Sequence, residues 1–181
     1  MLLGELKIID KSGKEWDSFF IKVIPKDCYP FCFPTVFVED ARLPKIPDWH
    51  IYEDGSCCFD VPLGEVLKCL DGLPVGHFLE RIAVPFFADQ AFRIKEGFYK
   101  GREYSHGIDG VLEFFASKLG CGKNLKDVKN ALSRYLYLRD SPKKLKNFRN
   151  KPEPWKALDK LPISYLKRNE TWFAEMLRCG L

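Results

Sequence analysis

The sequence predicts an α+β fold in which an antiparallel β-meander is followed by helices. Two observations support this prediction: β-forming residues cluster in three short segments before residue 40, and apolar residues recur at helical spacing after Pro74. Between these regions, residues 41–64 include Pro44, Pro47 and Pro62 and show no regular period. A long irregular segment inside a compact domain is usually functional or disordered, and its aromatic residues favour packing.

Three strands are expected from the distribution of apolar and aromatic residues: Leu3 to Ile9, Trp16 to Ile24 and Thr35 to Val38. Lys11-Ser12-Gly13-Lys14 supplies the turn between the first two, and Pro25, Pro30 and Pro34 mark an extended connection to the third. Strands joined by such short connections pair antiparallel, which predicts the meander.

Four helices are expected: one that begins at Pro74 and stops at Gly97, one from Ile108 to Gly120, one from Asn124 to Ser141-Pro142, and a last one capped by Ser164. Pro85 should kink the first of them, and Asn124 can cap the third. Residues 143–156 predict a basic linker. The chain therefore divides into a main domain at 1–120 and a helical basic extension at 121–181.

The composition is that of a globular protein without a membrane segment. Of the 181 residues, 46% are hydrophobic and 30% are charged, and no apolar run approaches the length of a membrane span. A net charge of +4 does not by itself require nucleic acid as a partner. The start of the chain has no basic region before an apolar block, so a cytoplasmic location is expected, with most of the seven cysteines as free thiols.

A turn followed by two cysteines marks the candidate site. Asp54-Gly55-Ser56 is a strong turn signal, Cys57 and Cys58 follow directly, and His50 precedes them. A thiol just after such a turn lies close to unpaired backbone N–H groups, which favour the thiolate, the nucleophilic form of cysteine. Adjacent side chains on an extended segment point to opposite faces, so only one of the two thiols should face an acyl donor.

Two stretches of this region resemble the ubiquitin-conjugating enzyme family. Tyr29-Pro30-Phe31-Cys32-Phe33-Pro34-Thr35-Val36 is similar to its Tyr-Pro-x-x-x-Pro-x-Val motif, and His50, Gly55, Cys58 and Asp60 match the histidine, glycine, catalytic cysteine and acid of its active-site motif. Ile51-Tyr52 stands where the family has Pro-Asn, and the spacing from His50 to Cys58 is shorter than the spacing usual in that family. The first strand begins near residue 2, where the family usually has a helix. The chain looks most like the bacterial members encoded in anti-phage CBASS operons.

The resemblance implies a UBC-like fold and an acyl transferase. Cys58 would form a thioester with the C-terminal tail of a partner, a cGAS-like nucleotidyltransferase, and transfer it to an amine or a thiol, which would regulate anti-phage signalling. His50 would fix the loop by hydrogen bonds, and Asp60 would orient an attacking amine. No cofactor is expected, and the chain has no phosphate-binding glycine-rich motif, so ATP-dependent activation belongs to another protein.

Four further residues are assigned supporting roles. Tyr52 or backbone N–H groups would replace the family's asparagine as donors to the oxyanion, and Asp54 is the second candidate carboxylate. Cys57 is expected to be a packed residue. His106 precedes a helix, which it could cap, or it could approach the site.

Three other interpretations remain open. The chain could be an inactive UBC-like module that docks a partner's tail. Cys28, Cys32, His50, Cys57 and Cys58 could supply zinc ligands, although their spacing is not that of a standard zinc module. The basic run at 143–156, with Phe148 and Trp155, could follow a nucleic-acid backbone, although a solvated linker or a docking arm for an acidic protein is the commoner outcome.

Overall fold

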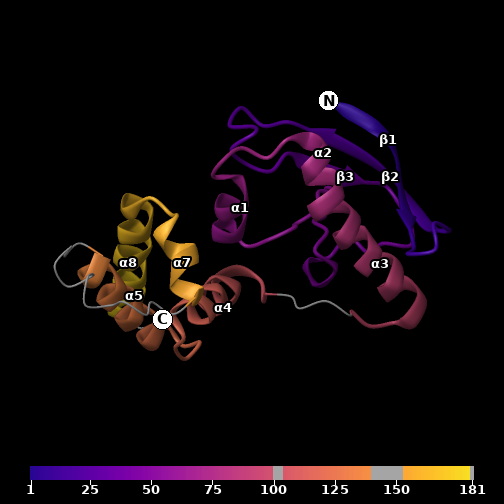
Figure 1. Cartoon of the computed structure of the whole chain (residues 1–181). Helices are drawn as coiled ribbons and strands as arrows, with labels where there is room; N and C mark the ends of the chain where they lie inside the picture. The colour runs from indigo at the N-terminus through magenta and orange to yellow at the C-terminus, as the bar shows by residue number, and fades with distance from the viewer. Residues whose placement is uncertain (100–103, 140–152, 180–181) are drawn as a thin grey trace. The chain divides into compact units, whose positions relative to one another are not determined.

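The computed structural model describes residues 1–99, 104–139 and 153–179 (Figure 1). It divides into two compact units, the first made of Met1–Val61 and Lys68–Glu103, the second of Pro62–Leu67 and Tyr104–Leu181. The division predicted from the sequence falls at residue 120. In the structure, the helix Gly107–Leu119 belongs to the second unit, together with the helices that follow it. The first unit holds the sheet and the candidate site.

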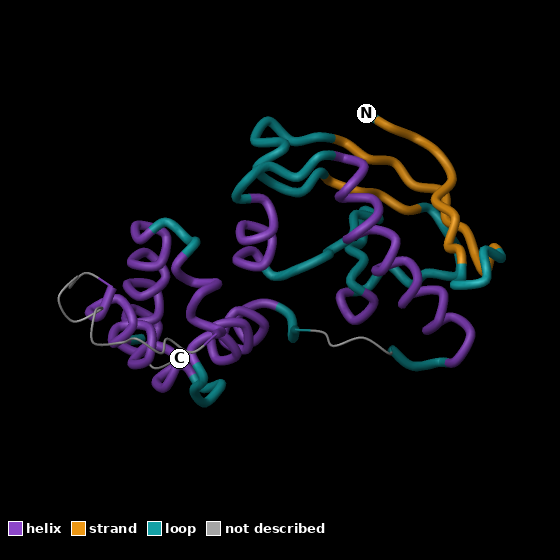
Figure 2. Tube along the Cα trace, viewed as in Figure 1, coloured by secondary structure: helices purple, strands orange, loops and turns teal. Residues whose placement is uncertain are grey.

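The first unit is built on a three-stranded antiparallel sheet, with the order β1-β2-β3 (Figure 2). The strands are β1 (Leu2–Ile9), β2 (Glu15–Ile24) and β3 (Thr35–Val38). Gly4 pairs with Ile21, and Val23 pairs with Val36. The predicted meander is confirmed, with the ends of each strand within one residue of the expected positions.

Alternation along the strands sends one face of the sheet into the core. Phe19, Ile21 and Val23 of β2 are buried, whereas Phe20 between them is exposed. This period of two follows from the pleat, which points successive side chains to opposite faces. The buried face packs against the helical segment that follows the candidate site, and the Phe19 and Phe87 rings lie 5.0 Å apart.

That helical segment consists of α2 (Val75–Phe78), a π-helical turn η2 (Leu79–Ala83) and α3 (Val84–Glu96). Figure 1 shows it running across the sheet. The disturbance predicted at Pro85 takes the form of this wider turn, which accommodates a residue without an N–H donor. Gly97 ends the helix as predicted, in the left-handed region at φ 81°, with its N–H bonded to the Arg93 carbonyl at 2.8 Å.

Among the residues that the structure describes, two short α-helices lie where the sequence did not predict them. Helix α1 (Pro62–Cys69) lies partly in the stretch expected to be irregular, and α7 (Glu153–Asp159) lies partly in the expected linker. Pro62 is the first residue of α1, where proline's missing N–H costs nothing. A proline that starts a helix has the same sequence appearance as one that interrupts a loop.

The described part of the second unit is helical, with α4 (Gly107–Leu119), α5 (Leu125–Arg139), α7 and α8 (Ile163–Arg178) in addition to the start of α1. Asn124 caps α5 as predicted, because its Oδ1 accepts the Asp127 N–H at 2.9 Å. The predicted cap at Ser164 is wrong. Pro162 occupies the N-cap position and helix α8 begins at Ile163, so the helix starts two residues earlier than a cap at Ser164 implies. The predicted stop at Ser141-Pro142 and the linker residues 143–152 lie outside the described residues.

Candidate functional site

The candidate site is a small hairpin formed by residues 50–58. The Cys58 N–H donates to the His50 carbonyl at 2.8 Å, and the Tyr52 N–H donates to the Ser56 carbonyl at 2.8 Å. Ile51 and Cys57 form an antiparallel bridge between these two bonds. This register places His50 directly opposite Cys58. Side chains that face each other across an antiparallel pair lie on the same face, so the imidazole and the thiol are brought together.

The second arm of the hairpin extends the sheet beside β3. The Cys57 N–H donates to the Val36 carbonyl at 2.8 Å, and the Val38 N–H donates to the Gly55 carbonyl at 3.0 Å. The hairpin is therefore held by a strand of the core sheet.

The tip of the hairpin is fixed by Asp54 and Gly55. The Asp54 Oδ1 accepts the Ser56 N–H at 2.9 Å and the Ser56 hydroxyl at 2.6 Å, and these bonds hold the pKa of the Asp54 carboxyl below its usual value. Gly55 has φ +84°, and a Cβ there would lie 3.1 Å from the Val38 carbonyl oxygen. Asp54 therefore has a structural role in the turn, and position 55 requires glycine.

Gly55→Ala is expected to lower the free energy of unfolding by about 1–3 kcal/mol, from the left-handed backbone penalty and the close approach to Val38. Urea denaturation would measure this loss. Gly13→Ala is the matched control, because Gly13 has φ +85° with open space around it. It should lose only the backbone part. Equal losses in the two variants would show that the contact with Val38 contributes nothing.

Cys57 points into the core. Its bridge partner Ile51 is only 1% exposed, and the Cys57 side chain packs against the same apolar cluster. Burial raises the pKa of the Cys57 thiol to about 12. A thiol with this pKa stays protonated at neutral pH, so Cys57 is a packing residue rather than a nucleophile.

Cys58 lies on the opposite face and is partly exposed. The hydrogen bond with His50 lowers the pKa of the Cys58 thiol most strongly. The Tyr52 hydroxyl, the charge of His50 and a backbone hydrogen bond with Asp60 act in the same direction, while partial burial opposes them. The lowering effects exceed the desolvation penalty. The site therefore combines an accessible sulfur with donors that stabilise its thiolate form.

His50 is held in an unusual backbone conformation. It follows the 3₁₀ turn η1 (Pro47–Trp49) and has φ 53° and ψ 30°, the left-handed region. It is the one residue other than glycine with positive φ in the described ranges. The Tyr99 ring lies 6.2 Å from the imidazole. Strained residues of this kind are typical of functional sites, where the surrounding structure enforces the conformation.

Tyr52 and Asp60 both lie near Cys58 but differ in availability. Tyr52 is half exposed, and its hydrogen bond to Cys58 raises the pKa of the phenol. The Asp60 carboxylate accepts the Val61 N–H at 2.8 Å and pairs with Lys68 at 2.6 Å. The protonated Cys58 thiol can donate to the Asp60 carbonyl, 3.8 Å away. The Tyr52 hydroxyl therefore has the Cys58 sulfur as its partner, whereas the Asp60 carboxylate is engaged by Val61 and Lys68.

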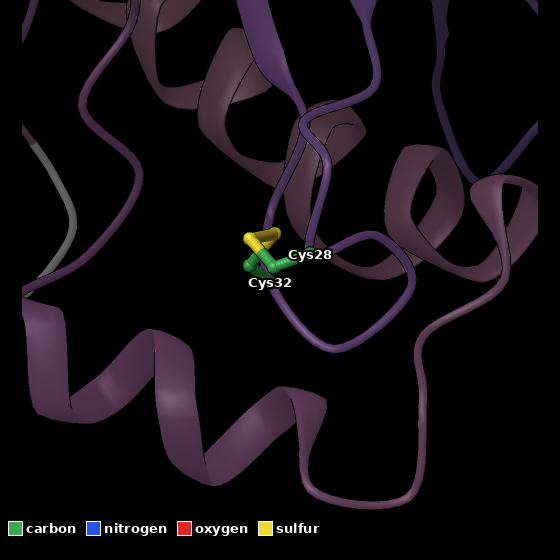
Figure 3. The surroundings of a disulfide bond; sticks show 2 residues. All are labelled: Cys28 and Cys32. Carbon is green, nitrogen blue, oxygen red and sulfur yellow. A yellow bond between two sulfur atoms is a disulfide. The ribbon is translucent and has the colours of Figure 1, made fainter.

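Two other predicted features are not part of the hairpin. His106 occupies the N-cap position of α4, in the second unit, and its side chain makes no capping hydrogen bond. Cys28 and Cys32 form a disulfide (Figure 3), so their sulfurs do not join His50 and Cys58 in a zinc site in this structure. Within residues 1–99, 104–139 and 153–179, no group of three or more His, Cys, Asp or Glu residues could hold a metal ion.

A surface depression of about 630 Å³ lies at the tip of the hairpin, lined by Tyr52, Glu53, Asp54 and Ser56. It shares Tyr52 with the surroundings of the thiol. Two of its four lining residues are carboxylates, which favours a cationic group as its occupant.

Three residues that contact the segment before Ile51 were not predicted from the sequence: Gln90, Arg93 and Tyr99. One signal was present for Gln90. It falls on the apolar stripe that contains Phe86 and Phe87, and a polar residue on a buried helix face requires an explanation. Arg93 and Tyr99 carried no comparable signal.

In comparisons with known proteins, no family model, no curated protein sequence and no solved structure matches this chain. Among the helices that the structure describes, none is long and apolar enough to cross a membrane. The fold and the site together define an α+β protein with a hydrogen-bonded cysteine–histidine pair on a sheet-edge hairpin.

Proposed function

We propose that the protein is a ubiquitin-conjugating-like acyl transferase that carries a partner protein's C-terminal acyl group as a thioester on Cys58. One observation carries this proposal: the His50 imidazole and the Tyr52 hydroxyl both hydrogen-bond to a partly exposed thiol whose pKa they lower. The neighbouring thiol of Cys57 has the opposite environment, so the hairpin selects one sulfur for chemistry.

The reaction begins with an activated acyl group, either an acyl adenylate or a thioester of an upstream protein. The Cys58 thiolate attacks the carbonyl carbon, the new S–C bond forms, and the adenylate or upstream thiolate leaves. Negative charge develops on the carbonyl oxygen during this step, and the Tyr52 hydroxyl can donate to it. A protonated amine then loses one proton to water, and the neutral amine attacks the thioester. The N–C bond forms, the S–C bond breaks with Cys58 leaving as the thiolate, and the second proton of the nitrogen passes to water.

The acidic depression favours an amine over a thiol as the acceptor. Glu53 and Asp54 provide two negative charges beside Tyr52, and a protonated amine gains electrostatically from them. A neutral thiol gains nothing comparable.

The partner follows from the family resemblance. The Tyr29-to-Val36 motif and the His50, Gly55 and Cys58 positions support a UBC-like protein of an anti-phage CBASS system, which acts in the cytoplasm. The antiparallel meander followed by a helix across the sheet agrees with that resemblance. The acyl donor is then the C-terminal tail of a cGAS-like nucleotidyltransferase.

Co-expression with the operon neighbours and intact-mass analysis test the proposal. The wild-type chain should gain the mass of the partner through a bond that thiols cleave. Cys58→Ser should yield an ester adduct that resists thiols, and Cys58→Lys a stable amide, whereas Cys57→Ser should behave as the wild type. If none of these proteins gains mass while the partner still copurifies, the alternative function applies, and the chain is a binding module for the partner's tail.

A further inference from the structure

Helix α3 holds the turn that precedes His50. Gln90 is completely buried, and its Nε2 donates to the Trp49 carbonyl at 3.0 Å. Arg93, one turn further along the helix, donates to the Asp48 carbonyl and to the Asp48 carboxylate, the latter at 3.2 Å. Its guanidinium also lies 4.3 Å from the centroid of the Trp49 ring. Two side chains of one helix thus hold two consecutive residues of η1.

These contacts determine the orientation of one peptide group. The Trp49 carbonyl and the His50 N–H belong to the same planar peptide unit. Gln90 donates to the Trp49 carbonyl oxygen of this unit, while the His50 N–H of the same unit donates to the Pro47 carbonyl at 2.7 Å. A peptide plane that is held at both ends cannot rotate freely. The left-handed φ of His50 is measured from this plane, so the direction of the imidazole depends on it.

The chemistry of Gln90 indicates a role other than stability. Its Oε1 is one of the buried side-chain oxygens that find no hydrogen-bond partner among the described residues. Burying an unpaired amide oxygen costs free energy, and an apolar side chain of similar length would fill the same space without that cost. The presence of glutamine here is explained if its amide donor is needed at the Trp49 carbonyl.

We propose that Gln90 and Arg93 are positioning residues, which hold the Trp49–His50 peptide and thereby direct His50 toward Cys58. This inference rests on the proposed function of Cys58 as a nucleophile. Neither residue is required to touch the acyl group. Their effect passes through the backbone of η1 to the imidazole.

The charged and titratable groups around Cys58 and His50 determine the pH profile of Cys58 reactivity. Cys58 is faced by His50 and Tyr52 from the hairpin and by the backbone of Asp60. The neighbouring Cys57 thiol is protonated at neutral pH and adds no charge. His50 is faced by the Tyr99 ring, and the Arg93–Asp48 ion pair lies next to it along the chain. Gln90 is uncharged, so replacing it leaves every charge in this set unchanged.

The test measures the rate of Cys58 alkylation by iodoacetamide across pH, resolved from Cys57 by fragment mass spectrometry, together with thermal unfolding. Gln90→Met removes the donor and keeps the buried volume. It should raise the midpoint of the pH profile by about one unit, a tenfold change in the thiol's acid dissociation constant, without lowering Tm. Arg93→Lys keeps the charge but loses the two-pronged contact, and should raise the midpoint less. Lys95→Gln, an exposed change on the same helix, should leave the profile unchanged.

Three outcomes decide the inference. A raised midpoint in Gln90→Met with unchanged Tm supports the positioning role. A lowered Tm with an unchanged midpoint overturns it and assigns Gln90 to stability alone. A wild-type midpoint at the value of free cysteine, about 8.5, overturns the proposed function as well. If Gln90→Met does not fold, Arg93→Gln decides in its place, because Arg93 lies nearer the surface.

Discussion

Replacing Cys58 by alanine is expected to abolish the acyl adduct, whereas Cys57→Ala is expected to retain it. The two thiols are adjacent in sequence, but their environments shift their pKa values in opposite directions. Burial raises the pKa of Cys57 to about 12, while His50 and Tyr52 lower that of Cys58. At pH 7, a thiol with a pKa near 12 is ionised in only about one molecule in 10⁵. Intact-mass analysis of the co-expressed proteins measures the adduct.

The same pair of variants should show the reverse order in stability. Cys57 packs against the core, so Cys57→Ala should lower the free energy of unfolding by about 1–2 kcal/mol in urea denaturation. Cys58→Ala removes a partly exposed side chain and should cost less. A Cys57→Ala protein that folds but forms no adduct would contradict the assignment of Cys58 as the nucleophile.

His50→Asn is expected to slow Cys58 alkylation by about tenfold at pH 6.5, with little effect at pH 9.5. The hydrogen bond and charge of His50 stabilise the thiolate, so removing the imidazole raises the pKa of Cys58. The thiolate fraction then falls most at pH values below the new pKa, and the two proteins converge above it. Asparagine tolerates the left-handed conformation of position 50, so the His50→Asn substitution removes the imidazole with little added backbone strain.

Tyr52→Phe is the graded comparison for this prediction. Its hydroxyl lowers the pKa of Cys58 less than the His50 hydrogen bond does, so the shift should have the same sign and a smaller size. A larger shift in Tyr52→Phe than in His50→Asn would mean that tyrosine, rather than histidine, is the main partner of the thiol.

The sheet could be predicted from the sequence because its signals are local. Alternation and β-forming residues in β2, with turn residues on either side, define strands without reference to distant parts of the chain. The separation of Cys57 from Cys58 followed from the same period of two, because extended neighbours face opposite ways. Helix α1 was missed because Pro62 gives the same signal at the start of a helix as in a loop.

The support for the site could not be predicted, because it depends on contacts between distant residues. Gln90 binds a carbonyl 41 residues earlier, and Arg93 binds one 45 residues earlier. The left-handed conformation of His50 has no sequence signal comparable to glycine's, since several polar residues visit that region only when the fold requires it. The candidate nucleophile could thus be named from a motif, but the residues that orient its partner could not.

The central claim is that His50 and Tyr52 make Cys58 the reactive thiol of this protein. The pH dependence of Cys58 alkylation in the wild-type protein tests this claim most directly. The predicted result is a single midpoint below about 8.5, the value for free cysteine, with Cys57 unmodified throughout. A midpoint at or above that value, or equal labelling of Cys57 and Cys58 in the folded protein, would contradict it.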